Sequence, residues 1–181
     1  MKHPQETTEH KFVPAPGDYV LYKSCGICRI DEIRRDSFGG DEERDYYVLS
    51  SVNDSRSSAY IPVGSPVAMS MQRLLKADEI HEAIRRLPDE TPDWITESRA
   101  RNAAYTEILN SGDRCAILGL LSVLTDYKRE QLAKKRKFYS GDEKLLTAAA
   151  KLITDEFSFV LGIPKNEVVP YIKKVAAQAT A

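Results

Sequence analysis

Cysteine, tryptophan and long apolar runs are scarce in this chain of 181 residues, which holds three cysteines and one tryptophan. No apolar run approaches the roughly 20 residues that a membrane-spanning helix needs, so no transmembrane segment is expected. Residues 1–12 are polar and lack an apolar stretch, so we expect a disordered tail there and no signal peptide; a second disordered tail is expected over 176–181. The small, odd number of cysteines favours a protein of a reducing cytoplasm.

Metal ligands and catalytic motifs are also sparse. Cys25 and Cys28 form a Cys-x-x-Cys pair, but Cys115 is distant in sequence and the histidines fall at no matching spacing, whereas a structural zinc site needs four ligands. A redox dithiol needs a thiolate at a helix N-terminus, and this pair lies between two strand-like segments. We interpret it as a strand–turn–strand in which Gly26 makes the tight turn, with incidental metal affinity or a redox role as the alternatives.

Sequence motifs of enzymes are missing as well. The chain contains no Gly-x-Gly-x-x-Gly, P-loop, His-Glu-x-x-His or Gly-x-Ser-x-Gly motif. We therefore expect no enzymatic activity, no cofactor and no metal.

Charge is distributed unevenly along the chain, although the net charge is only −1. Residues 1–90 carry 12 Lys and Arg against 16 Asp and Glu, and residues 91–181 carry 14 against 11. A split of this kind suggests that the halves have different partners. Neither half is basic enough to predict strong, sequence-independent binding of nucleic acid.

Two apolar periodicities divide the chain into two predicted domains. Short runs rich in Val, Ile, Tyr and Leu, separated by turn residues, predict strands over 18–23, 27–34, 45–52 and 58–63, with a further one over 71–75. After Leu75 the apolar period becomes 3.6, which indicates amphipathic helices. The predicted class is α+β, with a small antiparallel β-barrel over 13–76 followed by an all-α domain over 77–175.

Turn and cap residues punctuate the helical part. A polar, proline-bounded connector is expected over about 88–93, and it is the expected domain joint. The sequence Ser-Gly-Asp at 111–113 ends one helix and begins the next. Ser140 and Glu143 have the spacing of a capping box at the start of a long helix.

An ordered set of motifs carries a family resemblance over about residues 12–175. In the first half they are Pro16-Gly17-Asp18-Tyr19-Val20-Leu21-Tyr22, Gly26-Ile27-Cys28, Tyr46-Tyr47-Val48-Leu49 and Tyr60-Ile61-Pro62-Val63. In the second half they are Asp93-Trp94-Ile95, Ser111-Gly112-Asp113 and Ser140 with Glu143-Lys144. The set resembles the CarD/CdnL family of bacterial RNA-polymerase-binding transcription regulators, whose N-terminal module is shared with the transcription-repair coupling factor.

The resemblance implies a function without catalysis. The N-terminal module of the family is a Tudor-like (SH3-like) barrel that docks on the RNA polymerase β subunit, partly by pairing an exposed strand edge with it. The helical domain contacts promoter DNA at the upstream edge of the melted region, where an aromatic residue inserts in the minor groove and slows collapse of the bubble. A monomeric protein of the bacterial cytoplasm, associated with the nucleoid, is expected.

Candidate contact residues follow from these motifs and from the charges. For polymerase binding they are Arg34, Arg35, Tyr60, Ile61 and Pro62. For DNA binding they are Trp94, Arg99, Arg101, Lys134 and Lys144. Each has a structural alternative: Trp94 as a packing residue at a helix start, the arginines in ordinary surface pairs, and the run 134–137 as a solvated helix end. A gapless match to the family places its tryptophan position on Ser98.

Two other functions compete with this prediction. The same barrel could serve an adaptor that binds another protein, with the helical half as a docking surface and no role on DNA. A thiol or zinc protein built on Cys25 and Cys28 is the third possibility.

Overall fold

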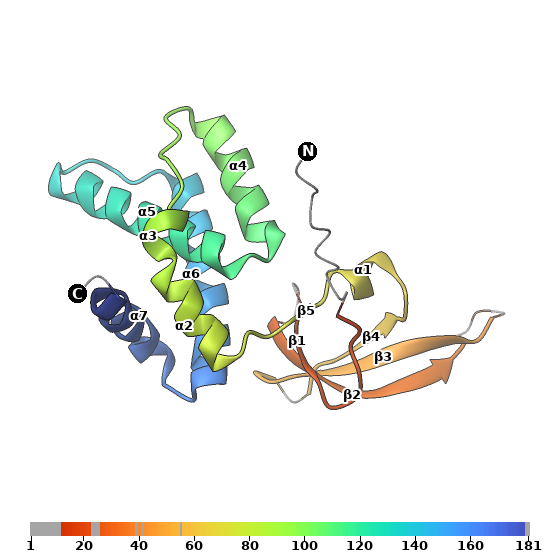
Figure 1. Ribbon diagram of the computed structural model, residues 1–181. Coiled ribbons are helices and arrows are strands. Elements are labelled where there is room, and N and C mark those ends of the chain that lie inside the picture. Colours follow the sequence, from red (N-terminus) through yellow and green to blue (C-terminus); the bar gives the residue numbers. More distant parts are fainter. Residues whose placement is uncertain (1–11, 23–25, 39, 41, 55, 180–181) are drawn as a thin grey trace, which may run out of the picture. The chain divides into compact units, whose positions relative to one another are not determined.

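The computed structural model describes residues 12–22, 26–38, 40, 42–54 and 56–179. The chain divides into two compact units, Met1–Leu74 and Leu75–Ala181. The first contains an antiparallel sheet and one short helix, and the second is all helical (Figure 1). The predicted α+β class is therefore confirmed.

Five antiparallel strands form the sheet of the first unit, in the spatial order β4-β3-β2-β1-β5. They are β1 (Tyr19–Tyr22), β2 (Gly26–Asp36), β3 (Arg44–Ser51), β4 (Ser58–Pro62) and β5 (Gln72–Arg73). Between β4 and β5 the chain forms the short helix α1 (Pro66–Met69), which begins at a serine cap followed by proline. The strands match the predicted segments, because a period of two is a direct consequence of burying one face of a sheet.

Closure into a barrel is not borne out by the described strands. The order of the sheet ends at β4 on one side and at β5 on the other, and in the described ranges no ladder joins these two strands. β5 has only two residues, and both pair with β1. So short a strand cannot provide the ladder that closure needs, and the sheet remains open with β4 as an edge strand.

The core of the first unit lies on one face of the sheet. Val20, Ile30, Leu49 and Ile61 come from four different strands and are almost completely buried. Gly26 starts β2 with φ of +78°, a conformation that only glycine adopts at little cost, so the predicted glycine turn is confirmed. Cys25, the other part of the predicted turn motif, lies outside the described residues.

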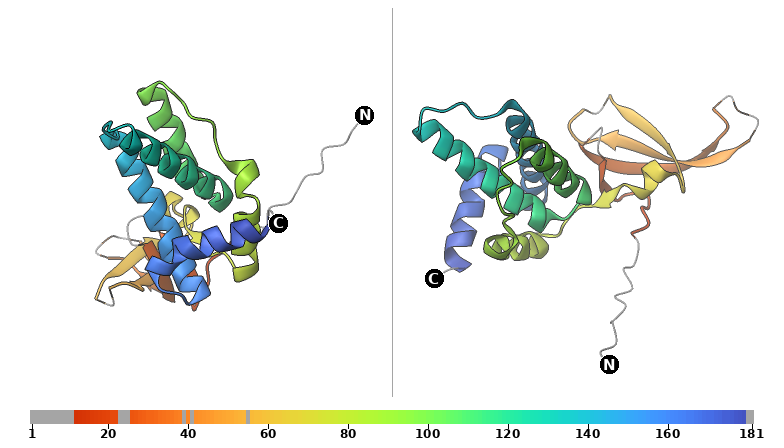
Figure 2. Two further views of the ribbon diagram at one scale, coloured as in Figure 1. Left: turned by 90° about the vertical axis from the view of Figure 1, so that its left-hand side faces the viewer. Right: turned by 90° about the horizontal axis from the view of Figure 1, so that it is seen from above.

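The described residues of the second unit form six helices. They are α2 (Ala77–Arg85), α3 (Leu87–Glu90), α4 (Ser98–Ser111), α5 (Arg114–Ala133), α6 (Ser140–Leu161) and α7 (Lys165–Ala179). The long α6 contacts α2, α4, α5 and α7 (Figure 2), and buried apolar residues of α2, α5, α6 and α7 form one cluster. Where the sequence predicts a connector over 88–93, the structure has α3 packed on α5.

Helix ends follow the predicted signals in one place and depart from them in another. Gly112 ends α4 in the left-handed conformation and the Asp113 carboxylate caps α5, as the Ser-Gly-Asp sequence predicts. The predicted capping box of Ser140 and Glu143 at the start of α6 is wrong. Tyr139 is the N-cap of α6 and makes no side-chain cap, and the Glu143 carboxylate instead accepts a hydrogen bond from Lys128 Nζ at 2.7 Å.

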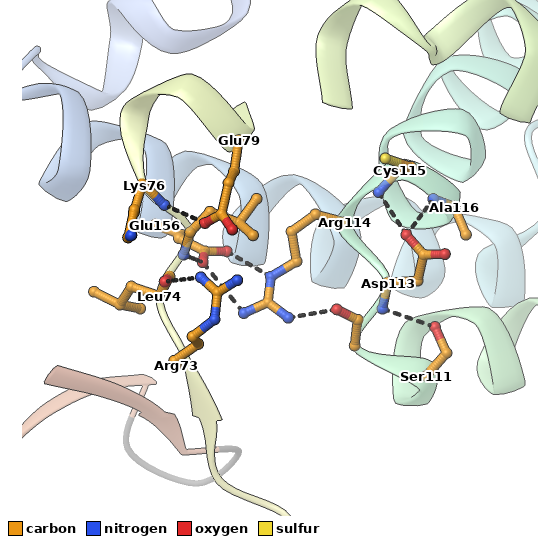
Figure 3. A network of polar contacts seen from close by, with 12 residues as sticks. Arg73, Leu74, Lys76, Glu79, Ser111, Asp113, Arg114, Cys115, Ala116 and Glu156 are labelled. Carbon is orange, nitrogen blue, oxygen red and sulfur yellow. Dashed lines mark hydrogen bonds and ion pairs between the residues drawn. The ribbon is translucent and has the colours of Figure 1, made fainter. Parts of the chain in front are cut away.

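A buried ion pair ties α5 to α6 (Figure 3). The Arg114 guanidinium donates to the Glu156 carboxylate at 2.7 and 3.2 Å, and both side chains are almost fully buried. The same carboxylate accepts the backbone N–H of Leu75 at 2.9 Å. The first residue of the helical unit is therefore fixed to its central helix.

Candidate functional site

The register of β4 decides which of its backbone groups face outward. The Val63 N–H donates to the Asp45 carbonyl at 2.8 Å, and in an antiparallel ladder such bonded pairs alternate with pairs whose groups point away. The backbone groups of Ser58, Tyr60 and Pro62 therefore point away from β3. Pro62 has no N–H and its carbonyl accepts a bond in the following turn, so Ser58 and Tyr60 supply the outward donors and acceptors of this edge.

An aromatic cluster lies beside this edge on the face of the sheet opposite its core. Phe38, in the turn after β2, packs edge-to-face against Tyr46 and Tyr60, with ring centroids 4.8 and 5.0 Å apart. The Arg34 guanidinium lies 5.8 Å from the centroid of the Tyr60 ring and pairs with Glu32. Phe38 and Tyr60 are 53% and 42% exposed, so the cluster is an accessible apolar surface with a cation at its border.

The predicted polymerase contacts separate into exposed and buried residues. Arg34, Arg35 and Tyr60 are exposed, and Arg35 pairs with Glu43 at 3.1 Å in water, where an ion pair exchanges partners at little cost. The Ile61 side chain is only 3% exposed, because odd-numbered residues of β4 face the core. Ile61 therefore holds the edge strand on the core of the sheet, and its contact with a partner stays a prediction.

Trp94 is packed in an aromatic stack of the helical unit. Its indole lies on the Tyr127 ring with centroids 3.6 Å apart and planes 19° apart, and the Arg101 guanidinium lies 4.4 Å from the indole centroid. Because Tyr127 already covers one face at stacking distance, the guanidinium takes the other. Trp94 also packs edge-to-face on buried Tyr105. This placement matches the packing alternative, and insertion of Trp94 into DNA stays a prediction.

Arg101 is buried beneath this stack and has structural partners. Its Nε and one terminal nitrogen donate to the Asp142 carboxylate at 2.9 and 2.8 Å, while the other donates to the carbonyls of Ile95 and Thr96. The hydrogen bond that Arg101 donates to the Asp142 carboxylate raises the pKa of Arg101, against the effect of burial. Four of its five N–H groups are used inside the protein, which matches a structural role, and the phosphate contact of Arg101 stays a prediction.

The remaining predicted DNA contacts lie on the surface. Arg99 is exposed in the first turn of α4, and Lys144 is exposed in the first turns of α6. Lys134 caps the C-terminus of α5 and pairs with Glu130. Arg99 also lines a shallow hollow with Ser98, Asn102, Ala103 and Tyr139, which joins the N-terminal ends of α4 and α6.

Sequence reasoning missed four residues that shape these surfaces: Phe38, Tyr127, Tyr139 and Asp142. Asp142 stands in the Ser-Gly-Asp-Glu sequence at 140–143, and its position there resembles that of a helix cap. Nothing local indicates that it pairs with an arginine 41 residues away. Phe38 precedes two glycines in a turn. A large aromatic side chain in such a turn is a local signal for a residue that serves a surface role and not the core.

The cysteines show no shared site in the described part of the chain. Cys28 is fully buried in the core of the sheet, Cys115 lies on α5, and Cys25 is outside the described residues. Burial raises the pKa of the Cys115 thiol, which makes it a poor nucleophile. Among the described residues no group of three potential metal ligands occurs, and no helix is long and apolar enough to cross a membrane.

Comparison with known proteins bears on the first unit. Residues 15–75 match the sequence model of the CarD-like/TRCF RID domain. This segment is therefore similar to that domain, which suggests a transcription-related module that interacts with RNA polymerase. The match ends where the helical unit begins. No curated protein sequence matches the chain.

Proposed function

We propose that this chain is a non-enzymatic transcription regulator of the bacterial cytoplasm and nucleoid. It binds the RNA polymerase β subunit through the sheet of its first unit and stabilises the promoter open complex through its helical unit. The match of residues 15–75 to an RNA-polymerase-interacting domain is the observation that carries this proposal. The sheet has the Tudor-like character of the family without closing into a barrel, and the chain acts as a monomer.

The edge of β4 supports the first part of the mechanism. An extended segment of the β subunit pairs with the outward N–H and C=O groups of Ser58 and Tyr60, which is the usual form of strand addition. The aromatic cluster then covers side chains of the added strand. Arg34 and Arg35 leave their exposed intramolecular partners for acidic groups of the polymerase, since exposed ion pairs contribute at most about 1 kcal/mol.

The helical unit supplies the second part. Its net positive charge allows phosphate contacts, which position a protein on DNA without reading sequence. Such weak contacts suffice once docking on the polymerase has raised the local concentration. A ligand that binds the open promoter complex better than the closed one shifts the balance by its differential affinity, and about 1.4 kcal/mol changes the equilibrium constant tenfold.

A pair of substitutions at Ser58 tests the docking mode. Ser58→Pro removes an outward N–H and leaves the ladder to β3 intact, because prolines are tolerated on an edge strand where the N–H faces solvent. Ser58→Ala keeps the N–H and is the matched control. We expect the proline variant of the full chain to bind the isolated β-subunit lobe at least tenfold more weakly than the alanine variant. Equal affinities for the two would contradict strand addition, and no binding by the wild type would contradict the function.

An adaptor without a DNA role is the second candidate. The burial of Arg101 and the stacking of Trp94 favour it, since both side chains already have partners inside the helical unit. The lifetime of open promoter complexes separates the two functions. A regulator lengthens that lifetime, and an adaptor binds polymerase or another protein and leaves it unchanged.

A further inference from the structure

Tyr139 is the most exposed aromatic side chain among the described residues of the helical unit, with 54% of its surface accessible. It is the N-cap of α6, and its hydroxyl and ring take no part in capping. In the part of the chain that the structure describes, no ring-stacking pair includes Tyr139. Its ring therefore presents an accessible apolar face on which another planar ring can stack.

The ring of Tyr139 packs against Gly141, which has no side chain to displace it. It lies across Gly141 so closely that a Cβ added there would stand 2.6 Å from its Cε1 and 3.5 Å from Asn102 Nδ2. One edge lines the hollow that it shares with Ser98 and Arg99 of α4. The ring is therefore positioned at the junction of two helix N-termini while remaining open to a ligand.

Positive charge surrounds this ring. The run of cations at 134–137 ends two residues before it, Arg99 borders its hollow, and Lys144 follows one turn into α6. Among the described residues, no ion pair involves Lys135, Lys137 or Lys144.

The nearby carboxylates are largely neutralised. Asp142 is paired with buried Arg101, and Glu143 with Lys128. Glu97 accepts the first N–H groups of α4, and the hydrogen bond from the Arg99 N–H is the main reason that its pKa is lowered. The field at Tyr139 therefore favours an anion.

Trp94, the aromatic residue that the sequence suggests for DNA, lies in a different environment. Both faces of its indole are covered, by Tyr127 and by the Arg101 guanidinium. The hollow that its exposed edge lines also contains Arg129, Asp126 and Glu130, and the two carboxylates pair with Arg129 and Lys134. Stacking on a base there would require opening the stack of Tyr127, Trp94 and Arg101.

We infer that Tyr139, and not Trp94, is the aromatic side chain that stacks on an unpaired DNA base at the edge of the promoter bubble. Arg99 and Lys144 hold the flanking phosphates as the ring covers the base. This inference rests on the proposed function, which supplies the DNA, and it names the side chain that acts there. Base–aromatic stacking combined with a basic surface is the usual device for binding single strands.

The test measures the lifetime of open complexes formed by RNA polymerase holoenzyme on promoter DNA after a competitor is added. Full-length wild type is compared with Tyr139→Ala, Tyr139→Phe and Trp94→Phe, at concentrations that saturate the polymerase. Alanine substitution at a base-stacking position typically weakens binding roughly 5- to 100-fold, so Tyr139→Ala is expected to lose most of the lengthening. The two phenylalanine variants keep an aromatic ring and are expected to retain it. Exposed Tyr139 can be replaced without unfolding the chain, which thermal unfolding of each variant verifies.

A second variant moves the ring without removing it. The Cβ of Gly141→Ala would displace the Tyr139 ring, while alanine in a helix is otherwise favourable. We expect this variant to shorten the lifetime relative to wild type, although it keeps Tyr139. A wild-type lifetime with Gly141→Ala would overturn the assigned position of the ring.

The outcomes separate the inference from the function. If wild type lengthens the lifetime and Tyr139→Ala does so equally, the role of Tyr139 is refuted and the proposed function stands. If wild type binds polymerase and leaves the lifetime unchanged, the DNA role fails and the inference fails with it.

Discussion

Replacing Arg101 by methionine is expected to destabilise the helical unit strongly. The Asp142 carboxylate, 1% exposed, would lose both of its guanidinium hydrogen bonds, and the Ile95 and Thr96 carbonyls would lose theirs. Removing one partner of a buried ion pair costs about 3 to 5 kcal/mol, because the other charge stays buried without compensation. For a unit of about 100 residues, where 1 kcal/mol shifts the melting temperature by roughly 4 °C, the expected decrease is about 12 to 20 °C.

Two further variants make this prediction specific. Arg101→Met combined with Asp142→Leu removes both charges and is expected to recover most of the lost stability, since apolar replacement of a buried pair is often neutral. Lys134→Met breaks an exposed pair with Glu130 and is expected to cost less than about 1 kcal/mol. The assay is urea unfolding followed by circular dichroism and by the fluorescence of Trp94, which is the single tryptophan and contacts Arg101 directly.

The reasoning would be refuted by a loss below about 1 kcal/mol for Arg101→Met, which is the range of an exposed pair. A double variant as unstable as the single one would also refute it, because the cost would then come from lost packing of the arginine stem and not from a buried charge.

Two other predictions concern packing and pH. An alanine Cβ at Gly119 would lie 2.2 Å from the carbonyl oxygen of Glu90, so Gly119→Ala is expected to cost about 1 to 3 kcal/mol in calorimetry, and an unchanged melting temperature would contradict the close approach of α3 and α5. Burial alone would raise the pKa of Asp155, but the hydrogen bonds and charges of Lys151 and Lys165 outweigh burial and hold it below its ordinary value. A lowered folded-state pKa means that this carboxylate stabilises the fold at neutral pH and that the contribution is lost as pH falls through the folded-state value. Asp155→Asn is therefore expected to cost about 1 kcal/mol at pH 7 and progressively less below about pH 4 in urea unfolding, and a cost independent of pH would refute the charge effect.

The sequence was sufficient for the parts of the fold that depend on local pattern. Strand segments follow from alternation, and the break at 111–113 follows from a left-handed glycine before a capping aspartate. The family resemblance of the first half also rests on an ordered local set, and the domain match over 15–75 confirms it. The open sheet could not be predicted from the sequence, because closure depends on whether β5 is long enough to pair with β4 as well as with β1.

The site residues depend on tertiary contacts that no local pattern encodes. Arg99 and Arg101 are two positions apart, which on a helix turns them by about 200° to opposite sides. One is exposed and the other is buried against Asp142, and only the position of α6 decides which. Similarly, Trp94 and Tyr139 are both aromatic residues near helix starts. Tyr127, more than 30 positions after Trp94, covers the indole of Trp94, whereas Tyr139 remains accessible.

The alternation of inward-facing and outward-facing backbone groups along β4 also limits self-association. An exposed strand edge is a template for any extended chain, including a second copy of the same protein, and natural sheets restrict it with short strands and prolines. Here Pro62 has no backbone N–H to donate. The outward donors and acceptors of each copy therefore come from two residues, Ser58 and Tyr60. An edge of this length offers only a short ladder to a second copy, so pairing of two edges contributes few hydrogen bonds to self-association.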